Sequence, residues 1–344
     1  MSINTYFNDF LSDIRPTESE KDACKEEHTT LRQNLLADPD LKDVVVTTFL
    51  QGSYRRATLV RPMGDEQPDV DVVVVTTLSQ NDLTPQQALD SFKPFLRNHY
   101  ANRWSSQGRS LGIAGDGVDL DLVVTAADSL EMREKIRKDA DTVNVEDTKP
   151  TVANWEREDP LWIPDREVGA WQETHPRAQI AWTHAKNKQT NGCYVNVVKA
   201  LKWWKLNHRS LPKHPKSYPL EHIVGDCCPN GITSIAEGVT LTLETIVSKF
   251  AVDASSGVVP LLSNRGLPQQ NVLARVPPDH FRVFVDCVKG AAREARQALD
   301  CHDLSEAVER WRTLFGDKFP PPPKGSGGFT PRGGSSTPGR TRFG

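Results

Sequence analysis

The sequence lacks the excess of positive charge that general binding to nucleic acid or to an anionic membrane requires. Its 344 residues include 42 Lys and Arg and 45 Asp and Glu, which gives a formal net charge of -3. Such a chain is not attracted as a whole to phosphate-rich surfaces. We therefore expect no membrane partner, and nucleic acid is the least favoured activating signal.

Long apolar runs are also missing. No stretch approaches the roughly 20 apolar residues of a membrane span, and residues 1–13 are too polar for a signal peptide. The six cysteines are scattered, and only Cys227 and Cys228 are neighbours, so they do not form the disulfide framework of a secreted domain. These absences predict a cytoplasmic protein.

What the chain does contain is an ordinary globular composition, with 37% hydrophobic and 25% charged residues. Its length favours more than one domain. Mixed strand and helix patterns are followed by helical patterns alone, which predicts an α+β fold with a cleft between two lobes. The expected division is a first lobe over 1–150, a helical lobe over 151–318 and a disordered Pro/Gly-rich tail over 319–344.

The chain is organised around a turn between two predicted strands. Residues 44–50 are apolar and largely β-branched, so we expect a strand that ends at the turn Gln51-Gly52-Ser53. A short helix is predicted over 54–60, and a second strand over 69–75. Side chains alternate along a strand, so the two acids of the second strand, Asp69 and Asp71, lie on one face.

Two carboxylates on a strand that is otherwise valine are costly unless something neutralises them. Hard oxygen ligands without a nearby His or Cys favour Mg²⁺, with Mn²⁺ as the alternative. Gly52 lets a phosphate approach the backbone, and Ser53 offers amide and hydroxyl donors at a helix start. The pattern therefore predicts a nucleoside triphosphate and metal site. The alternative is a capped helix followed by two solvated aspartates on an edge strand.

A later strand repeats this unusual placement of acids. Residues 109–113 and 118–125 are strand candidates joined by a Gly-Asp-Gly hairpin turn. Asp119 and Asp121 share a face of the second strand, so alternation alone does not choose between them. A two-metal site for phosphoryl transfer needs a further carboxylate, and one of these supplies it. The alternative is a hairpin with exposed acids.

Most of the remaining chain is predicted to be helical. A helix is expected over residues 16–37, because the capping-box pattern Thr17-Glu18-Ser19-Glu20 stands at its start. The segment 148–171 is expected to be an irregular connection, whose Trp155, Trp162 and Trp171 either stack on bases or seal the seam between the lobes. Further helices are expected over 84–100, 131–148, 176–188, 192–208, 218–224, 232–252, 280–299 and 304–315.

The turn Gln51-Gly52-Ser53, the pair Asp69 and Asp71 and the acid on a later strand together resemble the polymerase-β-like nucleotidyltransferases. Within them the chain looks most like the bacterial cGAS/DncV-like enzymes, the CD-NTases. The resemblance implies a two-lobed fold in which Asp121, followed by apolar residues, is the third metal ligand rather than Asp119. It covers roughly residues 17–300.

The resemblance also gives roles to two residues of the helical lobe. Composition alone makes Lys202 an ordinary solvated lysine. It matches, however, the family's lysine that contacts the triphosphate, and Ser217 falls where relatives place a serine on the same phosphates. A lysine and a hydroxyl from the second lobe would then hold the nucleotide against Ser53.

By this resemblance the chain is a cyclic oligonucleotide synthase that uses two metal ions to join ATP and GTP, or other nucleoside triphosphates, into a cyclic di- or trinucleotide for anti-phage signalling. Two alternatives stay open. One is a nucleotidyltransferase that modifies a tRNA or a protein, although the acidic chain lacks a basic stripe. The other is a nucleotide-binding scaffold without activity.

Two further hypotheses concern the C-terminal half. The family's metazoan relative has a zinc ribbon, and His222, Cys227 and Cys228 resemble part of it, but no fourth ligand follows nearby, so we favour buried cysteines. The tail ends in Gly344, and the resemblance suggests that a ubiquitin-like E1/E2 accessory protein joins this glycine to a target. The alternative is an inert, solvating tail.

Overall fold

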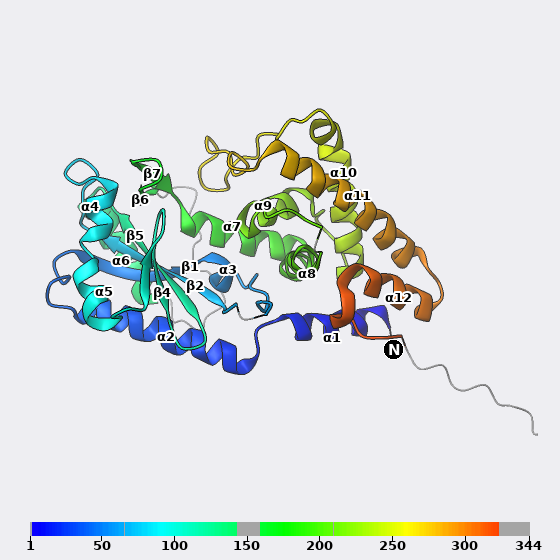
Figure 1. Cartoon of the computed structure of the whole chain (residues 1–344), viewed down its shortest axis with the longest axis horizontal. Helices are drawn as coiled ribbons and strands as arrows, with labels where there is room; N and C mark the ends of the chain where they lie inside the picture. Colours follow the sequence, from blue (N-terminus) through cyan, green and yellow to red (C-terminus); the bar gives the residue numbers. More distant parts are fainter. Residues whose placement is uncertain (1, 65, 143–158, 209, 323–344) are drawn as a thin grey trace, which may run out of the picture.

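The structure is a computed structural model that describes residues 2–64, 66–142, 159–208, 210–322. The predictions for Trp155 and for the tail beyond residue 322, including Gly344, lie outside the described residues. Figure 1 shows two lobes side by side: a mixed sheet with its helices, and a lobe built from helices. Within the described ranges, no helix combines the length and the apolar character needed to cross a bilayer.

The sheet brings the two acid-bearing strands together. Its strand order is β1-β2-β5-β4-β3, and β6 and β7 continue it beyond β5. β1 pairs antiparallel with β2, whereas β2 and β5 run parallel. The valines of β2 are buried on both faces of the sheet, as expected for a central strand. The strands are β1 (Val45–Gln51), β2 (Asp69–Thr76), β3 (Trp104–Ser106), β4 (Leu111–Ala114), β5 (Asp119–Ala126), β6 (Leu161–Asp165) and β7 (Ala170–Thr174).

Helices cover both faces of the sheet. α2 (Glu18–Ala37) starts with the predicted capping box at Thr17, and it packs on one face together with α4 (Pro85–Asp90) and α5 (Lys93–His99). The helix predicted over 84–100 is therefore two short helices. α6 (Leu130–Thr142) contributes Ile136 to the core of the opposite face.

The helical lobe has a core of its own, and the N-terminal helix α1 (Ile3–Ile14) belongs to it. The sequence analysis did not predict α1. Phe7 and Phe10 of α1 pack on Phe315 and Phe319, with ring centroids 4.6–5.9 Å apart. The other helices are α7 (Pro176–Gln189), α8 (Tyr194–Asn207), α9 (Ser217–Cys227), α10 (Ile235–Ser255), α11 (Pro278–Asp300) and α12 (Leu304–Phe315).

Two predictions of irregular chain are wrong where the structure describes them. Phe319, the first residue of the predicted tail, is completely buried in the helical core. The predicted connection 148–171 includes β6 and the start of β7, which extend the sheet past residue 150, and the division of the chain at that residue stays a prediction. The indoles of Trp162 and Trp171 donate to Asp128 and to the Leu83 carbonyl, at 2.6 and 2.7 Å. These bonds hold both tryptophans within the sheet lobe rather than across the seam.

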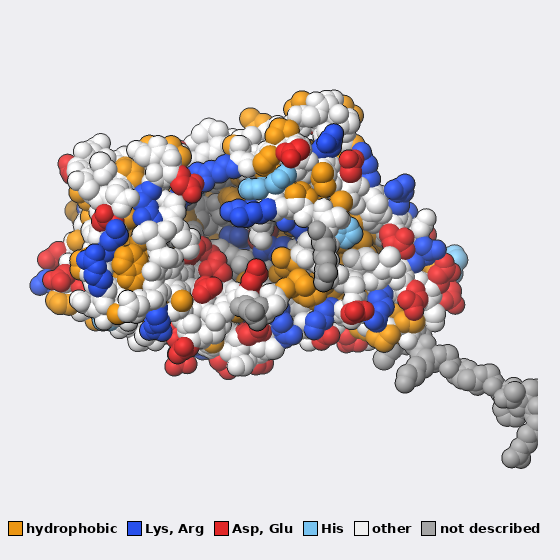
Figure 2. Space-filling model, viewed as in Figure 1, with side chains coloured by type: hydrophobic (Ala, Val, Ile, Leu, Met, Phe, Trp, Pro, Cys, Tyr) orange, Lys and Arg blue, Asp and Glu red, His pale blue; other side chains and the backbone are white. Residues whose placement is uncertain are grey.

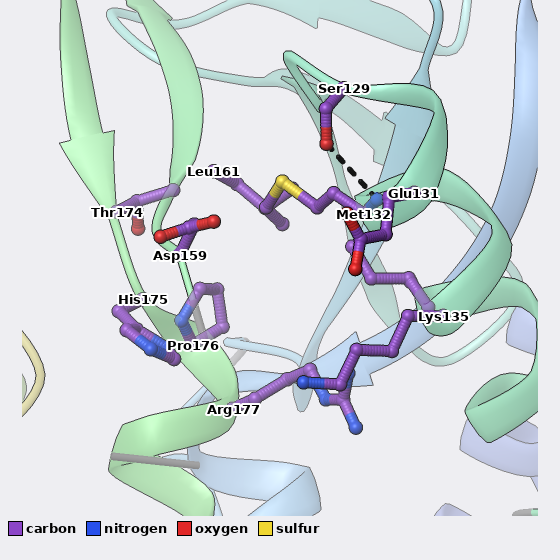
Figure 3. A pocket seen from close by; sticks show the side chains of 11 residues that line it. Ser129, Glu131, Met132, Lys135, Asp159, Leu161, Thr174, His175, Pro176 and Arg177 are labelled. Atoms are coloured by element: carbon purple, nitrogen blue, oxygen red, sulfur yellow. Dashed lines mark hydrogen bonds between the residues drawn. The ribbon is translucent and has the colours of Figure 1, made fainter. Parts of the chain in front are cut away.

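The surface between the lobes is hollowed. In Figure 2, acidic side chains lie on the sheet side of this hollow and basic side chains on the helical side. A separate cavity of about 170 Å³ lies where α6 faces β6 and the start of α7, with Lys135 and Arg177 at one end (Figure 3). None of the residues predicted to bind metal or nucleotide lines that smaller cavity.

Candidate active site

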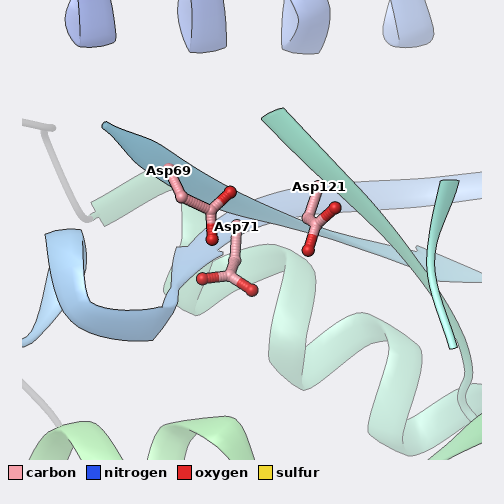
Figure 4. Close-up of side chains that lie close together, drawn as sticks. All are labelled: Asp69, Asp71 and Asp121. Carbon is pink, nitrogen blue, oxygen red and sulfur yellow. The ribbon is translucent and has the colours of Figure 1, made fainter. Parts of the chain in front are cut away.

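Three aspartates meet near the start of the neighbouring strands β2 and β5. The parallel register of β2 and β5 places Asp71 opposite Asp121, and Asp69 opposite Asp119. Each of Asp69, Asp71 and Asp121 offers an oxygen within 4.8 Å of the others, and their carboxylates point toward one another (Figure 4). Among the described residues, Asp119 is not part of this group. The register thus brings Asp121, the acid that the family resemblance indicated, next to Asp69 and Asp71.

The surroundings of the aspartates make full ionisation costly. Burial, and then the charges of Asp71 and Asp121, raise the pKa of Asp69 to about 8. Burial and Asp71 raise the pKa of Asp121 to about 6, in spite of hydrogen bonds from Gln107 and Ser110. Burial also raises the pKa of Asp71. Crowded carboxylates with hard oxygen donors fit a divalent cation, which supplies the missing counter-charge.

Gly52 packs directly against this acidic group. It is the first residue of α3 (Gly52–Arg55), and its φ of +72° lies in the left-handed region. A Cβ atom at this position would overlap the Asp71 carboxylate, so only glycine fits. The side chain of the preceding Gln51 donates to Asp71, which lowers the pKa of that carboxyl. Gln51 therefore orients the Asp71 carboxylate, and its predicted role in nucleotide binding stays a prediction.

Ser53 follows in the same turn. Its carbonyl accepts hydrogen bonds from the amides of Thr58 and Leu59, at 2.9 and 3.1 Å, which fix the turn. Within the described part of the chain, the Ser53 hydroxyl has no hydrogen-bond partner. This hydroxyl is free to donate to a ligand beside the aspartates. α3 is shorter than the helix predicted over 54–60.

Lys202 lies in a buried ionic cluster that joins the two lobes. Its ammonium is 2.6 Å from Glu221 and donates to the Thr58 carbonyl at 3.1 Å. Arg56 donates to the other oxygen of Glu221 at 3.0 Å, and the Thr58 hydroxyl donates to the first at 3.0 Å. Arg56 and Thr58 come from the sheet lobe, whereas Lys202 and Glu221 lie on α8 and α9. The cluster ties the segment after Ser53 to both helices.

The two cations set the charge state of Glu221. Burial alone would raise its pKa, but Lys202 and Arg56 hold the pKa of Glu221 at about 2. The carboxylate therefore stays ionised at neutral pH. The sequence analysis missed Arg56 and Glu221. The lysine in the largely apolar α8 is a signal that could have indicated a buried acidic partner. It does not give the partner's position, and Glu221 is 165 residues from Arg56.

The remaining candidates occupy the start and the end of α9. Ser217 is exposed at its first turn, one turn before Glu221, so both face the same side of the helix. His222, Cys227 and Cys228 are buried, and burial lowers the pKa of His222 to about 3. In the described ranges, the only group of three or more His, Cys, Asp or Glu side chains close enough to share a metal ion is the three aspartates.

Comparisons with known proteins agree with this geometry. Residues 1–135 match the family described as the Second Messenger Oligonucleotide or Dinucleotide Synthetase domain. The chain is 40% identical to a cyclic AMP-AMP-GMP synthase of Enterobacter hormaechei subsp. hoffmannii, with 96% of both chains covered. It is 31% identical to a cyclic AMP-AMP-AMP synthase of Acinetobacter sp., with 93% of this chain and 86% of the relative covered.

A solved structure shares the fold. The CD-NTase CdnG of Bradyrhizobium diazoefficiens, determined in complex with GTP, superposes with a TM-score of 0.70 over 93% of this chain and 96% of that chain. Because the two sequences are 14% identical, this likeness shows the fold alone. The predicted two-lobed α+β fold of the polymerase-β-like type is confirmed.

Proposed function

The chain belongs to the bacterial CD-NTase family of nucleotidyltransferases, and from this we propose that it joins ATP and GTP into a cyclic oligonucleotide at the three aspartates. The observation that carries the proposal is the meeting of Asp69, Asp71 and Asp121 beside the Gly52-Ser53 turn. The family is metal-dependent, and these carboxylates are suitable metal ligands. The Enterobacter relative is named for a product with two adenylates and one guanylate, so we propose a cyclic trinucleotide of this kind.

The protein's part in the reaction is to hold the metal ions and to orient the donor nucleotide. Asp69, Asp71 and Asp121 would ligate two Mg²⁺ ions, or Mn²⁺ in their place. When bound, such ions activate the attacking ribose hydroxyl and neutralise the phosphates of the donor nucleotide. Gln51 keeps the Asp71 carboxylate in position by its hydrogen bond. Gly52 leaves the space that the Asp71 carboxylate occupies, and the Ser53 hydroxyl donates to a phosphate oxygen of the donor.

The helical lobe would close the other side of the nucleotide. We place Ser217 on the phosphates, since it is exposed and one turn from the ionic cluster. Lys202 is close enough to Asp71 for their charges to interact. We propose that Lys202 faces the phosphates while Glu221 and the Thr58 carbonyl hold its ammonium in place. In this arrangement the two lobes position donor and acceptor together.

A product assay separates this proposal from its alternatives. Purified protein is incubated with labelled ATP, GTP, CTP and UTP and Mg²⁺, and the mixture is then treated with phosphatase. We expect a small phosphatase-resistant product that requires both ATP and GTP. Label on tRNA or protein would support transfer to a macromolecule instead, and absence of turnover under all conditions would support a scaffold.

The biological context stays a proposal drawn from the family resemblance. The product would act as a second messenger in anti-phage defence, and Gly344 would be joined to a target by an E1/E2-like accessory protein. The second point has a direct test, in which the accessory protein is incubated with the full chain and with a chain that lacks Phe343 and Gly344. We expect a covalent adduct with the full chain alone. An adduct with both chains would remove the idea.

A further inference from the structure

A basic cavity lies apart from the aspartates, between α3, α7 and α8. Its volume is about 460 Å³, and its lining includes Arg15, Arg55, Arg56 and Lys199 but, among the residues that the structure describes, no acidic one. None of the residues assigned above to metal or to donor phosphates lines it, and it shares only Arg56 with the ionic cluster around Glu221. The concentration of positive charge in one concave space is unusual for a chain whose overall charge is -3.

Lys199 is the most informative residue of this lining. It is 8% exposed, and it makes no hydrogen bond or ion pair with any residue in the described ranges. The charges that face it come from Arg15, Lys21 and Lys202, and all are positive. Burial and these charges lower the pKa of Lys199 to about 8. An ammonium with little exposure and no partner in the described chain is costly, so its charge is left to water or to a ligand in the cavity.

Two arginines beside Lys199 are in a similar position. Arg55 has no hydrogen bond or ion pair to any described residue, and burial lowers its pKa. Arg15 donates from one terminal nitrogen to Asn196 at 2.8 Å, while its buried Nε has no partner among the described residues. Arg56 alone is paired, with Glu221. The cavity therefore holds three cations that no described acid neutralises.

We propose that this cavity binds a small organic phosphate with at least two negative charges. Its volume falls in the range of small-molecule sites, roughly 300–1,000 Å³. Arginines bind phosphate through two parallel hydrogen bonds, and lysine adds a point charge. Thr183 and Asn187 line the same cavity and offer hydrogen bonds to a sugar or a base. A nucleotide substrate and a cyclic product share this chemistry.

The cavity is built from segments that also carry the proposed active site. Arg55 and Arg56 follow Ser53 within the same turn of chain, and Lys199 precedes Lys202 by one helical turn on α8. A ligand on Arg55 and Lys199 would bias the position of both elements. This regulatory role rests on the proposed function, whereas binding itself does not.

Binding is measured by calorimetry on the full chain in EDTA, so that metal-dependent binding at the aspartates is suppressed. The probes are ATP, a cyclic dinucleotide and a 20-base-pair DNA duplex. The variant Lys199→Met keeps the unbranched side chain up to the terminal ammonium and removes its charge. The matched control is Lys188→Met, which removes an exposed lysine of α7 that does not line the cavity.

We expect ATP or the cyclic dinucleotide to bind the parent and Lys188→Met equally, and Lys199→Met at least about tenfold more weakly. The melting temperature of ligand-free Lys199→Met should equal or exceed that of the parent, because the variant removes an unpaired buried charge. If Lys199→Met does not fold, Arg55→Gln takes its place.

Equal binding by the two lysine variants, or binding of neither organic phosphate, would overturn the proposal. So would Lys199-dependent binding of DNA alone. The product assay is run in parallel, so a failure of the proposed function is seen separately.

Discussion

The aspartates of the sheet lobe and the glutamate of α9 are the same chemical group in opposite surroundings. Asp69, Asp71 and Asp121 face one another, and their pKa values are raised. Glu221 lies between Lys202 and Arg56, and its pKa is held at about 2. Asp69 is exposed and Asp71 and Asp121 are half-buried, whereas Glu221 is buried. Burial raises the pKa of a carboxyl group, so it does not explain why the most buried of these groups has the lowest pKa. The neighbouring charges decide it.

The comparison indicates what each carboxylate contributes. Glu221 has cations of the chain as partners, so its charge serves the structure and ties α3 to α8 and α9. The aspartates have no such complete set of partners, and their charge balance is left to bound metal ions. A substitution of Glu221 should therefore affect stability first. A substitution of one of the three aspartates should affect catalysis first.

The largest expected effect is the loss of nucleotidyl transfer in Asp71→Asn. The amide keeps the shape of the side chain but weakens metal binding, so we expect turnover to fall at least about 10³-fold, since each 1.36 kcal/mol of lost transition-state stabilisation is a factor of ten. Rates are measured as pyrophosphate released from ATP and GTP.

The matched control is Asp119→Asn, which changes an exposed acid on β5 that lies outside the group of three. Its rate should stay within about threefold of the parent, as for other surface substitutions. A comparable loss in both variants would contradict the assignment of Asp121 over Asp119.

A second large effect is expected for Gly52→Ala. The added methyl group overlaps the Asp71 carboxylate and displaces either the turn or the acid. Misplacement of a catalytic group by about 1 Å costs roughly 100-fold in rate. Gly64→Ala is the control, because Gly64 also has a positive φ, +66°, but no described residue beyond its chain neighbours lies within 4 Å of its added Cβ. Equal rates in the two variants would show that the close approach to Asp71 has no role.

Glu221→Gln should act first on stability. It leaves Lys202 and Arg56 buried without their counter-charge, which costs about 3 kcal/mol of unfolding free energy. Glu244→Gln provides a matched control, because its partner Arg296 and Glu244 itself are both more than a third exposed, and such pairs contribute about 1 kcal/mol or less. Urea unfolding measures both. Similar losses in the two variants would contradict the structural role of the buried cluster.

The smallest effect is a dependence of stability on pH. Because the pKa of Glu221 is lower in the folded protein than its usual 4.5, its contribution is complete above pH 4.5 and is lost as the pH falls toward 2. Between pH 7 and pH 4 the parent should lose less than about 1 kcal/mol through this group. Glu221→Gln should lack this part of the acid response. An unchanged acid response in the variant would contradict the pKa assigned to Glu221.

Local chemistry explains which parts of the fold were predictable. The capping box at Thr17 and the alternation around Asp69 and Asp71 are patterns of adjacent residues, so the sequence predicts α2 and β2 closely. The strands β6 and β7 were missed because a proline, Pro164, lies within β6 and polar residues fill β7. Pairing with the edge of the sheet, a tertiary contact, makes them strands.

The same distinction applies to the site. The three aspartates follow from strand alternation and from the family resemblance, which chose Asp121 over Asp119. The register of β2 and β5 then places Asp121 opposite Asp71. The cluster around Glu221 and the unpaired charge of Lys199 depend on contacts between distant segments. Neither residue differs from a surface charge in its local sequence. The packing of α3, α8 and α9 determines which groups surround them.

The most direct test is anomalous X-ray scattering from crystals grown with Mn²⁺ and a non-hydrolysable ATP analogue. We expect anomalous peaks for two ions between Asp69, Asp71 and Asp121, with the analogue's phosphates beside Ser53, and no such peaks in Asp71→Asn crystals. Mn²⁺ and phosphates bound elsewhere, with the three aspartates free of metal, would contradict the central claim.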